Sequence, residues 1–201
     1  MKLFYSPYAC SLAPHIVLRE LDLPFQLERV DASTRRTETG EDYLAINPKG
    51  YVPALRLDSG EILTEAPAIM QYLADAFAPD TLAPLSGSVE RARLNGHLNY
   101  IAAELHKPLG SLFDGKMPAA TRSAVTDVLQ QRFSLIEQLL ADGRDYLSGP
   151  DHTLADIYVF VVWNWAPMVG FEVAPFPKIS ALAKRIESRP AVQAALRVEN
   201  E

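Results

Sequence analysis

Hydrophobic and polar positions in residues 1–80 alternate between a two-residue period and a helical period. Alternation of apolar and polar residues is typical of a half-buried strand, and apolar residues three and four apart are typical of an amphipathic helix. The pattern predicts a β-α-β opening, a helical turn, two short strands and a helix. The predicted strands are 2–5, 25–30, 52–57 and 61–64, and the predicted helical segments are 11–21, 42–46 and 65–77.

Two clusters of turn-forming residues punctuate this region. Asn47-Pro48-Lys49-Gly50 is a strong breaker that ends the predicted helical turn. Asp58-Ser59-Gly60 separates the last two predicted strands, so it predicts a hairpin turn.

Beyond residue 87 the chain shows helical periodicity only. Thr153 and Asp156 have capping-box spacing ahead of a nearly all-apolar run, so that helix is predicted to lie at the centre of a core, with Asp156 as a structural carboxylate. The predicted helices are 88–112, with an interruption at Pro108, and 119–141, 153–165 and 179–189.

Strands mixed with helices, followed by helices alone, predict a small α/β domain joined to an all-α domain. The segment 78–87 contains two prolines and has no consistent period, which is typical of a linker. We therefore expect domains at 1–80 and 88–201, joined by a linker at 81–87.

Composition narrows the class of protein. With 201 residues and 48% hydrophobic content, the chain can bury a substantial core. The net charge of −6 and the absence of a long basic run argue against nucleic acid as a partner. The four histidines show no metal-ligand spacing, so we predict no metal site.

The N-terminal sequence lacks the apolar segment and cleavage site of a secretory signal, and no apolar run approaches 18 residues. We expect a soluble, cytoplasmic protein with no membrane association. The single cysteine excludes an internal disulfide framework.

That cysteine, Cys10, falls where the first strand is predicted to turn into a helix. A thiol at a helix N-terminus faces unpaired N–H groups and a partial positive charge, which can lower its pKa from about 8.5 to between roughly 3.5 and 7.5. Ser11 and Tyr5 are candidate hydrogen-bond donors to the sulfur. We predict a reactive thiolate; the alternative is a small, inert side chain in the core.

Five motifs together resemble bacterial beta-class glutathione S-transferases, over essentially the whole chain. They are Pro7-Tyr8-Ala9-Cys10-Ser11-Leu12-Ala13-Pro14-His15, Asn47-Pro48-Lys49-Gly50-Tyr51-Val52-Pro53-Ala54-Leu55, Leu63-Thr64-Glu65, Glu104-Leu105-His106-Lys107 and Thr153-Leu154-Ala155-Asp156-Ile157-Tyr158. The resemblance implies a thioredoxin-like N-terminal domain (βαβαββα), an all-helical C-terminal domain, and a homodimer with two glutathione sites near the interface.

The resemblance also implies a glutathione site, with glutathione as a co-substrate. Val52 and a cis Pro53 would present backbone to the ligand's cysteinyl residue, with an ordinary trans bond as the alternative. Glu65 and Ala66 would bind its glutamyl group; Ala66 lacks the hydroxyl of the serine common at this position. Arg35 would meet its glycine carboxylate, unless it is a solvated loop cation. The implied binding residues are Cys10, Arg35, Val52, Pro53, Glu65, Ala66, Asn99, Ala103, Glu104, Leu105 and His106, some of them acting in the neighbouring subunit's site.

The residues implied to be catalytic are Cys10, His106 and Lys107. In the resembling family His106 and Lys107 lie near the active sulfur, where a histidine could move protons and a lysine could stabilise negative charge. His15 is interpreted as structural. Tyr8 replaces a glycine frequent in the family, which would narrow access to the sulfur.

The leading hypothesis is a glutathione transferase that presents the glutathione thiolate to hydrophobic electrophiles in a cleft between the domains. Because Cys10 can also form a mixed disulfide with glutathione, we predict thiol-disulfide exchange as well, with disulfides as further substrates. Alternatives are a non-catalytic protein that binds ligands or docks a partner, and a relative specialised for dehalogenation or isomerisation. Candidate apolar residues of the cleft wall are Tyr8, Phe113, Trp163 and Trp165. For the two tryptophans we favour packing in the core.

Overall fold

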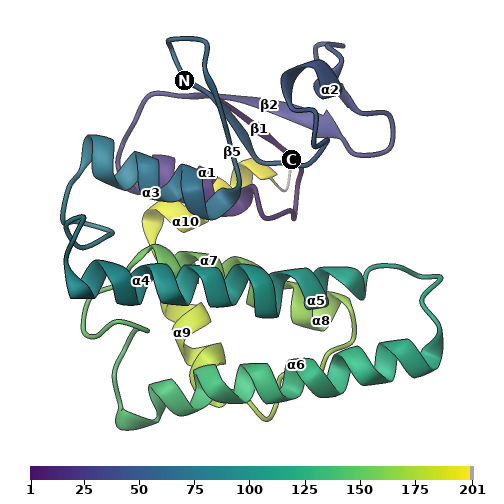
Figure 1. Cartoon of the computed structure of the whole chain (residues 1–201), viewed down its shortest axis with the longest axis vertical. Helices are drawn as coiled ribbons and strands as arrows, with labels where there is room; N and C mark the ends of the chain where they lie inside the picture. Colours follow the sequence, from purple (N-terminus) through teal and green to yellow (C-terminus); the bar gives the residue numbers. More distant parts are fainter. Residues whose placement is uncertain (200–201) are drawn as a thin grey trace. The chain divides into compact units, whose positions relative to one another are not determined.

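The computed structural model describes residues 1–199 and divides the chain into two compact units (Figure 1). The first unit comprises residues 1–81 together with the segment from Arg189 onward, and the second comprises residues 82–188. The sequence-based division placed everything from 88 to 201 in the second domain, so the structure assigns the C-terminal segment differently. Residues 200 and 201 of that predicted domain lie outside the described residues.

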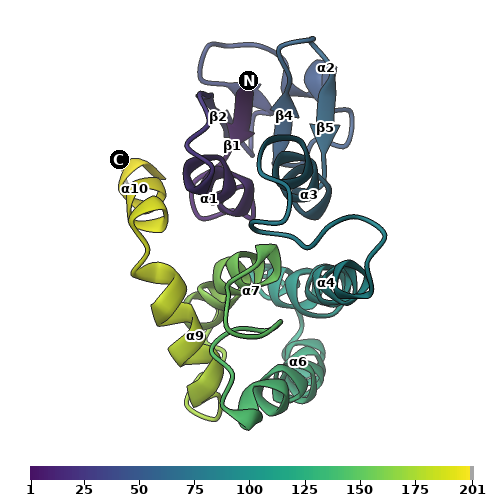
Figure 2. The same ribbon diagram turned by 90° about the vertical axis from the view of Figure 1, so that its left-hand side faces the viewer.

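The first unit is built on a five-stranded mixed sheet with the order β3-β2-β1-β4-β5 (Figure 2). β1 and β2 are parallel, with Lys2 opposite Gln26, and the remaining pairs are antiparallel. The strands are β1 Lys2–Tyr5, β2 Gln26–Asp31, β3 Arg36–Thr37, β4 Ala54–Arg56 and β5 Ile62–Thr64.

The strand β3 was not predicted from the sequence. It contains two residues only and has no hydrophobic alternation, so periodicity could not reveal it. A local turn produces it instead: the Asp31 carboxylate accepts hydrogen bonds from the backbone N–H groups of Ser33 and Thr34, at 2.7 and 3.1 Å. The thioredoxin-like order of the other predicted elements is confirmed.

Helices cover both faces of this sheet. α1 (Leu12–Glu20) and α3 (Ala66–Phe77) pack together on one face, and α2 (Tyr43–Ile46) lies on the other (Figures 1 and 2). Alternate residues of the strands point to opposite faces. On the α2 face, the cluster of Phe4, Val30, Tyr43 and Ala54 is buried.

The C-terminal helix α10 (Pro190–Glu199) lies beside α1 (Figure 2). Arg189 donates two hydrogen bonds to Glu20, at 2.6 and 2.9 Å. At the other end of the helix, His15 Nδ1 lies 2.8 Å from Glu199 Oε1, and Arg19 donates to His15 Nε2 at 2.9 Å. His15 is fully buried and joins two helices, which agrees with a structural role.

The second unit is helical throughout its regular elements. Every residue of α7 is buried, so this helix is the centre of the core, as its apolar sequence predicted. The helices are α4 Val89–Tyr100, η1 Ile101–His106, α5 Lys107–Ser111, α6 Ala119–Leu139, η2 Leu140–Asp142, α7 Leu154–Trp163, α8 Trp165–Met168 and α9 Pro177–Glu187. None of the helices between residues 1 and 199 is long and apolar enough to cross a membrane.

Asp156 forms the predicted capping box at the start of α7. Its carboxylate accepts hydrogen bonds from the Thr153 N–H and the Leu147 N–H, both at 2.8 Å. Burial raises the pKa of Asp156 to about 6, although the hydrogen bonds from Leu147 and Thr153 oppose the rise. The carboxylate therefore connects the helix start to the loop before it.

Pro108 does not interrupt the long helix as predicted. The helical path is continuous from α4 through η1 into α5, and Pro108 lies in the first turn of α5. The helix type changes before the proline, because residues 101–106 form a π-helix. A wider turn on the N-terminal side of a proline accommodates its ring and its missing N–H, and π-helical turns often occur at functional sites.

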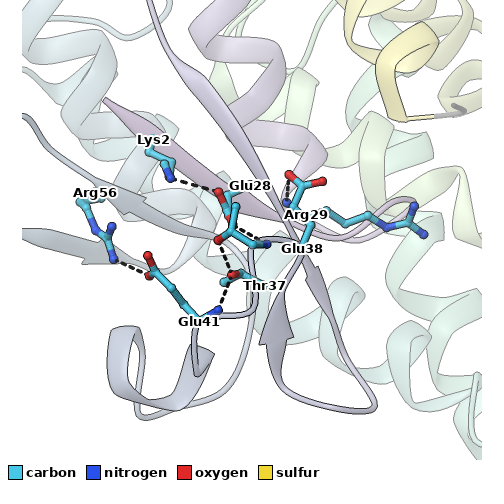
Figure 3. A network of polar contacts seen from close by, with 8 residues as sticks. Lys2, Glu28, Arg29, Thr37, Glu38, Glu41 and Arg56 are labelled. Atoms are coloured by element: carbon cyan, nitrogen blue, oxygen red, sulfur yellow. Dashed lines mark hydrogen bonds and ion pairs between the residues drawn. The ribbon is translucent and has the colours of Figure 1, made fainter.

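A polar network anchors β2 to its neighbours (Figure 3). Glu28 is almost fully buried, and its carboxylate accepts hydrogen bonds from Lys2 Nζ at 3.0 Å and from the Thr39 hydroxyl at 2.5 Å. Burial alone would raise the pKa of Glu28, but the hydrogen bonds from Thr39, Lys2 and Thr37 outweigh it and lower the pKa to about 2. The network therefore holds an ionised carboxylate inside the first unit.

We predict that the free energy of unfolding falls less on acidification in Glu28→Gln than in the wild-type protein. The folded pKa of about 2 lies below the value of about 4.3 expected in the unfolded chain, so the carboxylate stabilises the fold fully above pH 4.3 and progressively less toward pH 2. Between pH 6 and pH 3 the wild-type protein should lose about 2 kcal/mol more free energy of unfolding than the variant.

Urea unfolding at the two pH values measures this difference. Glu38→Gln is the matched control, because Glu38 is an exposed carboxylate on the same hairpin, where it accepts a hydrogen bond from the Arg29 N–H at 3.0 Å. If the wild type and Glu28→Gln lost the same free energy of unfolding between pH 6 and pH 3, the low pKa of Glu28 would be contradicted.

Candidate functional site

The sulfur of Cys10 lies next to the turn that enters β4. Cys10 is part of the loop between β1 and α1, and its Sγ donates a hydrogen bond to the Val52 carbonyl oxygen at 3.4 Å. The bond between Val52 and Pro53 is cis, as predicted. The structure therefore brings together three of the predicted site residues, Cys10, Val52 and Pro53, which come from two separate stretches of sequence.

The predicted lowering of the Cys10 pKa is wrong. Burial raises the pKa of the thiol to about 12; a hydrogen bond from its own backbone N–H opposes the rise, and the negative charge of Glu65 adds to it. The S–H bond to the Val52 carbonyl also favours the protonated form, because only the thiol can donate it. At neutral pH Cys10 is a thiol.

One of the two predicted donors to the sulfur, the Ser11 hydroxyl, is engaged elsewhere. Ser11 is fully buried, and its hydroxyl donates to the Ser6 carbonyl at 3.1 Å. The Tyr5 ring packs against the ring of His15, with centroids 6.4 Å apart. α1 begins at Leu12, so Cys10 lies outside the helix, and the N–H of Ala13 already donates to the Cys10 carbonyl.

Two buried side chains hold the segment before Val52, and sequence reasoning did not identify them. The Tyr43 hydroxyl and the Asn47 side-chain amide both donate to the Tyr51 carbonyl, at 2.8 and 2.7 Å. Burial raises the pKa of Tyr43 to about 12, so the hydroxyl stays protonated and remains a donor. Asn47 was recognised as part of a breaker cluster and of one family motif, but not as a donor that holds the backbone.

Arg35 reaches the same segment. Its guanidinium donates a hydrogen bond to the carbonyl of Gly50, and the residue has a positive φ of 57°. Gly50 has φ 69°, and a Cβ there would lie 3.1 Å from Leu44 Cδ2 and 3.3 Å from Arg35 Nη1. Glycine is therefore favoured at position 50 by the backbone conformation, and a Cβ there would also crowd the ends of the Leu44 and Arg35 side chains.

Glu65 precedes α3, whose first residue is the buried Ala66. The Glu65 carboxylate is exposed and lies 2.7 Å from Lys49 Nζ. Sequence reasoning did not single out Lys49, although it belongs to one of the quoted motifs. The ion pair demonstrates that the Glu65 carboxylate can hold an ammonium group at the start of a helix, where backbone N–H groups lack intrahelical partners.

Unusual backbone conformations gather around these residues. Among residues 1–199, five non-glycine residues have a positive φ: Tyr8, Asp22, Arg35, Glu65 and Asp80. Three of them, Tyr8, Arg35 and Glu65, belong to the segments that carry the candidate site. Such conformations persist where the surrounding structure enforces them, and they concentrate at functional sites.

The remaining predicted site residues belong to the second unit. His106 ends the π-helix η1, and its Nδ1 lies 2.6 Å from the Tyr158 hydroxyl on α7. Its ring packs edge-on against Trp165, with centroids 4.9 Å apart. The imidazole is thus held in a fixed orientation by two aromatic residues, and no sequence pattern indicated the contact with Tyr158.

The other predicted site residues of this unit differ in their exposure to solvent. Asn99, Ala103 and Lys107 are exposed, whereas Leu105 is fully buried. Glu104 Oε2 forms an ion pair with Arg132 Nη2 at 2.6 Å. Leu105 therefore exposes neither its side chain nor its backbone to a ligand.

The candidate apolar wall residues fall into two groups. Trp163 is 5% exposed and packs against Phe133, so it is a core residue, and Trp165 is 6% exposed. Phe113 and Tyr8 are exposed. The preference for core packing of both tryptophans is confirmed.

Within residues 1–199, no group of three or more His, Cys, Asp or Glu side chains is arranged to hold a metal ion. A pocket of about 450 Å³ opens at the start of β1, the end of the strand away from Cys10. Its lining residues include Lys2, Phe25 and Arg56 and none of the predicted site residues.

Comparisons with known proteins give one consistent family. The model "Glutathione S-transferase, N-terminal domain" matches residues 5–76, and "Glutathione S-transferase, C-terminal domain" matches residues 101–190. The chain is 45% identical to the glutathione S-transferase GstA of Escherichia coli O157:H7, over 99% of this chain and 98% of the relative.

Two solved structures are similar over nearly their whole length. One is a sphingomonad glutathione S-transferase complexed with glutathione, with 45% identity, a TM-score of 0.94 and coverage of 100% of this chain and 99% of the other. The second is the bacterial beta-class glutathione S-transferase of Sphingomonas chungbukensis, with 43% identity, a TM-score of 0.94 and coverage of 99% and 98%.

We predict that Cys10 reacts slowly with iodoacetamide at pH 7. A pKa of about 12 leaves very little thiolate, and the higher nucleophilicity of a basic thiolate recovers only about half of that loss on a logarithmic scale. Alkylation should be about two orders of magnitude slower than for free cysteine, and the rate should keep rising above pH 9. Mass spectrometry measures it, with Cys10→Ser as the background control. A rate that levels off below pH 8 would show that the thiol is acidic.

Proposed function

Because the chain belongs to the glutathione S-transferase family, we propose that it binds glutathione on the first unit and activates the glutathione thiol for attack on hydrophobic electrophiles. The observation that carries this proposal is the position of Cys10 Sγ, 3.4 Å from the Val52 carbonyl. A peptide ligand that lies along the Val52 backbone would place its own sulfur beside that of Cys10.

The proposed binding mode uses four features of the first unit. Glu65 would hold the ligand's ammonium group, and the exposed pair with Lys49 supports this because a similar cation already lies 2.7 Å from the carboxylate. The Ala66 N–H at the start of α3 would hold the neighbouring carboxylate. Val52 would pair with the cysteinyl backbone, and Arg35, fixed on the Gly50 carbonyl, would meet the glycine carboxylate.

In the proposed mechanism Cys10 acts as a hydrogen-bond donor. Because burial keeps Cys10 protonated, its S–H can turn from the Val52 carbonyl to a bound glutathione thiolate and stabilise the anion. The thiolate then attacks the electrophilic carbon; the new C–S bond forms as the leaving group departs with its electron pair. The hydrogen bond from the Cys10 thiol lowers the pKa of the glutathione thiol. Cys10 forms no covalent bond and stays protonated in this route.

Thiol-disulfide exchange would use the same sulfur in its ionised form. The Cys10 thiolate would attack the glutathione sulfur of a substrate's mixed disulfide with glutathione, forming the Cys10–glutathione disulfide and releasing the substrate as a thiolate; a free glutathione thiolate would then attack that disulfide, restoring the Cys10 thiolate and forming oxidised glutathione. Since the pKa of Cys10 is about 12, we propose that this route is slow at neutral pH and that conjugation dominates.

The second unit, residues 82–188, is proposed to supply part of the electrophile site. His106, oriented by Tyr158, would exchange protons near the sulfur, and Lys107 would stabilise negative charge. We also propose a cytoplasmic homodimer. Asn99 and Ala103 are exposed, as a contribution to the site of a second copy requires.

We predict that incubation with oxidised glutathione adds one glutathionyl group per chain, slowly at pH 7 and faster at pH 9. Intact-mass spectrometry measures the adduct, and Cys10→Ala should show none. Conjugating turnover should fall in Cys10→Ala because the donor to the glutathione thiolate is lost. A protein that neither binds nor turns over glutathione would refute the proposed function.

We predict that Glu65→Gln weakens glutathione binding by about 10- to 100-fold, because a hydrogen bond to a charged group contributes about 1.5 to 3 kcal/mol. Titration calorimetry measures the dissociation constant. Lys49→Met is the matched control: it removes the cation that already occupies the carboxylate, so binding should be equal or tighter. If Lys49→Met bound glutathione more weakly than Glu65→Gln, then Lys49, and not Glu65, would be the residue that binds the ligand.

A non-catalytic binding role is the second candidate, and the raised pKa of Cys10 favours it against any reaction in which Cys10 itself is the nucleophile. Retention on immobilised glutathione with no turnover of electrophiles or disulfides would support that role against the transferase proposal.

A further inference from the structure

The π-helical turn η1 contains a carbonyl that an α-helix could not accommodate. In an α-helix the carbonyl of Glu104 would accept a hydrogen bond from the N–H of residue 108, but that residue is Pro108, which has no N–H. The proline ring would also collide with the Glu104 carbonyl. A wider turn relieves this collision, and a donor from outside the helix can then reach the carbonyl.

Arg132 on α6 is such a donor, and α6 packs against η1 (Figure 1). Arg132 Nη1 donates to the Glu104 carbonyl at 3.2 Å, and Arg132 Nη2 forms the ion pair with Glu104 Oε2 at 2.6 Å. The hydroxyl of Tyr100, the residue directly before η1, donates to the Arg132 carbonyl at 3.0 Å. Arg132 therefore holds η1 at its start and in its middle.

These contacts fix geometry more than they add stability. The side chains of Arg132 and Glu104 are 30% and 40% exposed, and an ion pair with that exposure contributes little to the free energy of unfolding. A planar guanidinium that bonds a carbonyl and a carboxylate of the same residue nevertheless fixes the position of that residue, because its donors have a rigid arrangement. A geometric role in the middle of η1 affects the residue that ends it.

That residue is His106, whose orientation depends on the type of helix before it. A π-helical turn closes its hydrogen-bonded ring with one residue more than an α-helical turn, so the side chains that follow are rotated by roughly 100° about the helix axis. With this rotation, His106 Nδ1 lies 2.6 Å from the Tyr158 hydroxyl. An α-helical turn in place of η1 would move the imidazole away from Tyr158.

From these contacts we propose that Arg132 is a positioning residue: by holding Glu104 it maintains the π-helical turn that orients the imidazole of His106. The inference rests on the proposed function, in which His106 exchanges protons near the glutathione sulfur, and deepens it. Arg132 acts through His106, so it needs no contact with the substrate.

The kinetic test uses Arg132→Met with 1-chloro-2,4-dinitrobenzene as the electrophile. Its kcat should fall roughly 10- to 100-fold, because a misplaced proton-transfer group loses most of its effect. Arg132→Lys, which keeps the charge but not the planar fork, should lose less. Arg185→Met is the matched control and should keep the wild-type kcat: Arg185 on α9 makes the same two contacts with Asp145, to its carbonyl at 3.0 Å and its carboxylate at 3.2 Å.

A double variant separates positioning from a general structural effect. If Arg132 acts through His106, adding Arg132→Met to His106→Ala should not lower kcat further. An equal loss with and without His106 would overturn the inference. The Tm should fall by a similar amount in Arg132→Met and Arg185→Met, about 4 °C or less. If Arg132→Met does not fold, Arg132→Lys takes its place, with a smaller loss of kcat expected in the presence of His106 only.

A measurement without turnover separates failure of this inference from failure of the transferase function. Nitrogen-15 NMR reports the hydrogen bond at His106 Nδ1, and the loss of the signal in His106→Ala assigns it. In Arg132→Met the Nδ1 resonance should move toward the value of a solvated histidine, and in Arg185→Met it should stay in place. An unchanged resonance in Arg132→Met overturns the role of Arg132 whether or not the protein catalyses conjugation.

Discussion

The hydrogen bond from Cys10 Sγ to the Val52 carbonyl is the contact on which the candidate site depends. It joins the loop after β1 to the segment that enters β4, and each of those segments is fixed independently. Ser6 and Ser11 hold the first, and Tyr43 and Asn47 hold the second. The sulfur is consequently positioned by rigid elements on both sides, which is what a reaction that requires two adjacent sulfur atoms demands.

This contact also determines the chemistry of Cys10. A half-buried sulfur with a raised pKa that donates to a carbonyl is a poor nucleophile at neutral pH but a suitable hydrogen-bond donor to another sulfur. In the proposed mechanism the nucleophile is therefore the sulfur of the ligand. The exposed ion pair between Glu65 and Lys49 and the guanidinium of Arg35 show that cations and anions are already placed around the same segment.

The sequence predicted the order of the main elements because their hydrophobic periods are regular, as in the helix around Leu18 or the apolar helix α7. It did not predict β3, which is made by the side chain of Asp31, or α10, which is attached to α1 by Glu199 and His15. Periodicity carries no information on such polar contacts between distant residues. For the same reason the motif around Cys10 located the sulfur but misjudged its pKa, which depends on burial and on Val52, 42 residues away.

The central claim is that Cys10 donates a hydrogen bond to the thiolate of bound glutathione. Ultraviolet absorbance of the thiolate, titrated against pH with and without glutathione, tests it most directly. The account predicts that no thiolate forms in the free protein near neutral pH, that the complex forms one, and that its midpoint moves to higher pH in Cys10→Ala. A thiolate that titrates near neutral pH in the free wild-type protein, and disappears in Cys10→Ala, would contradict it.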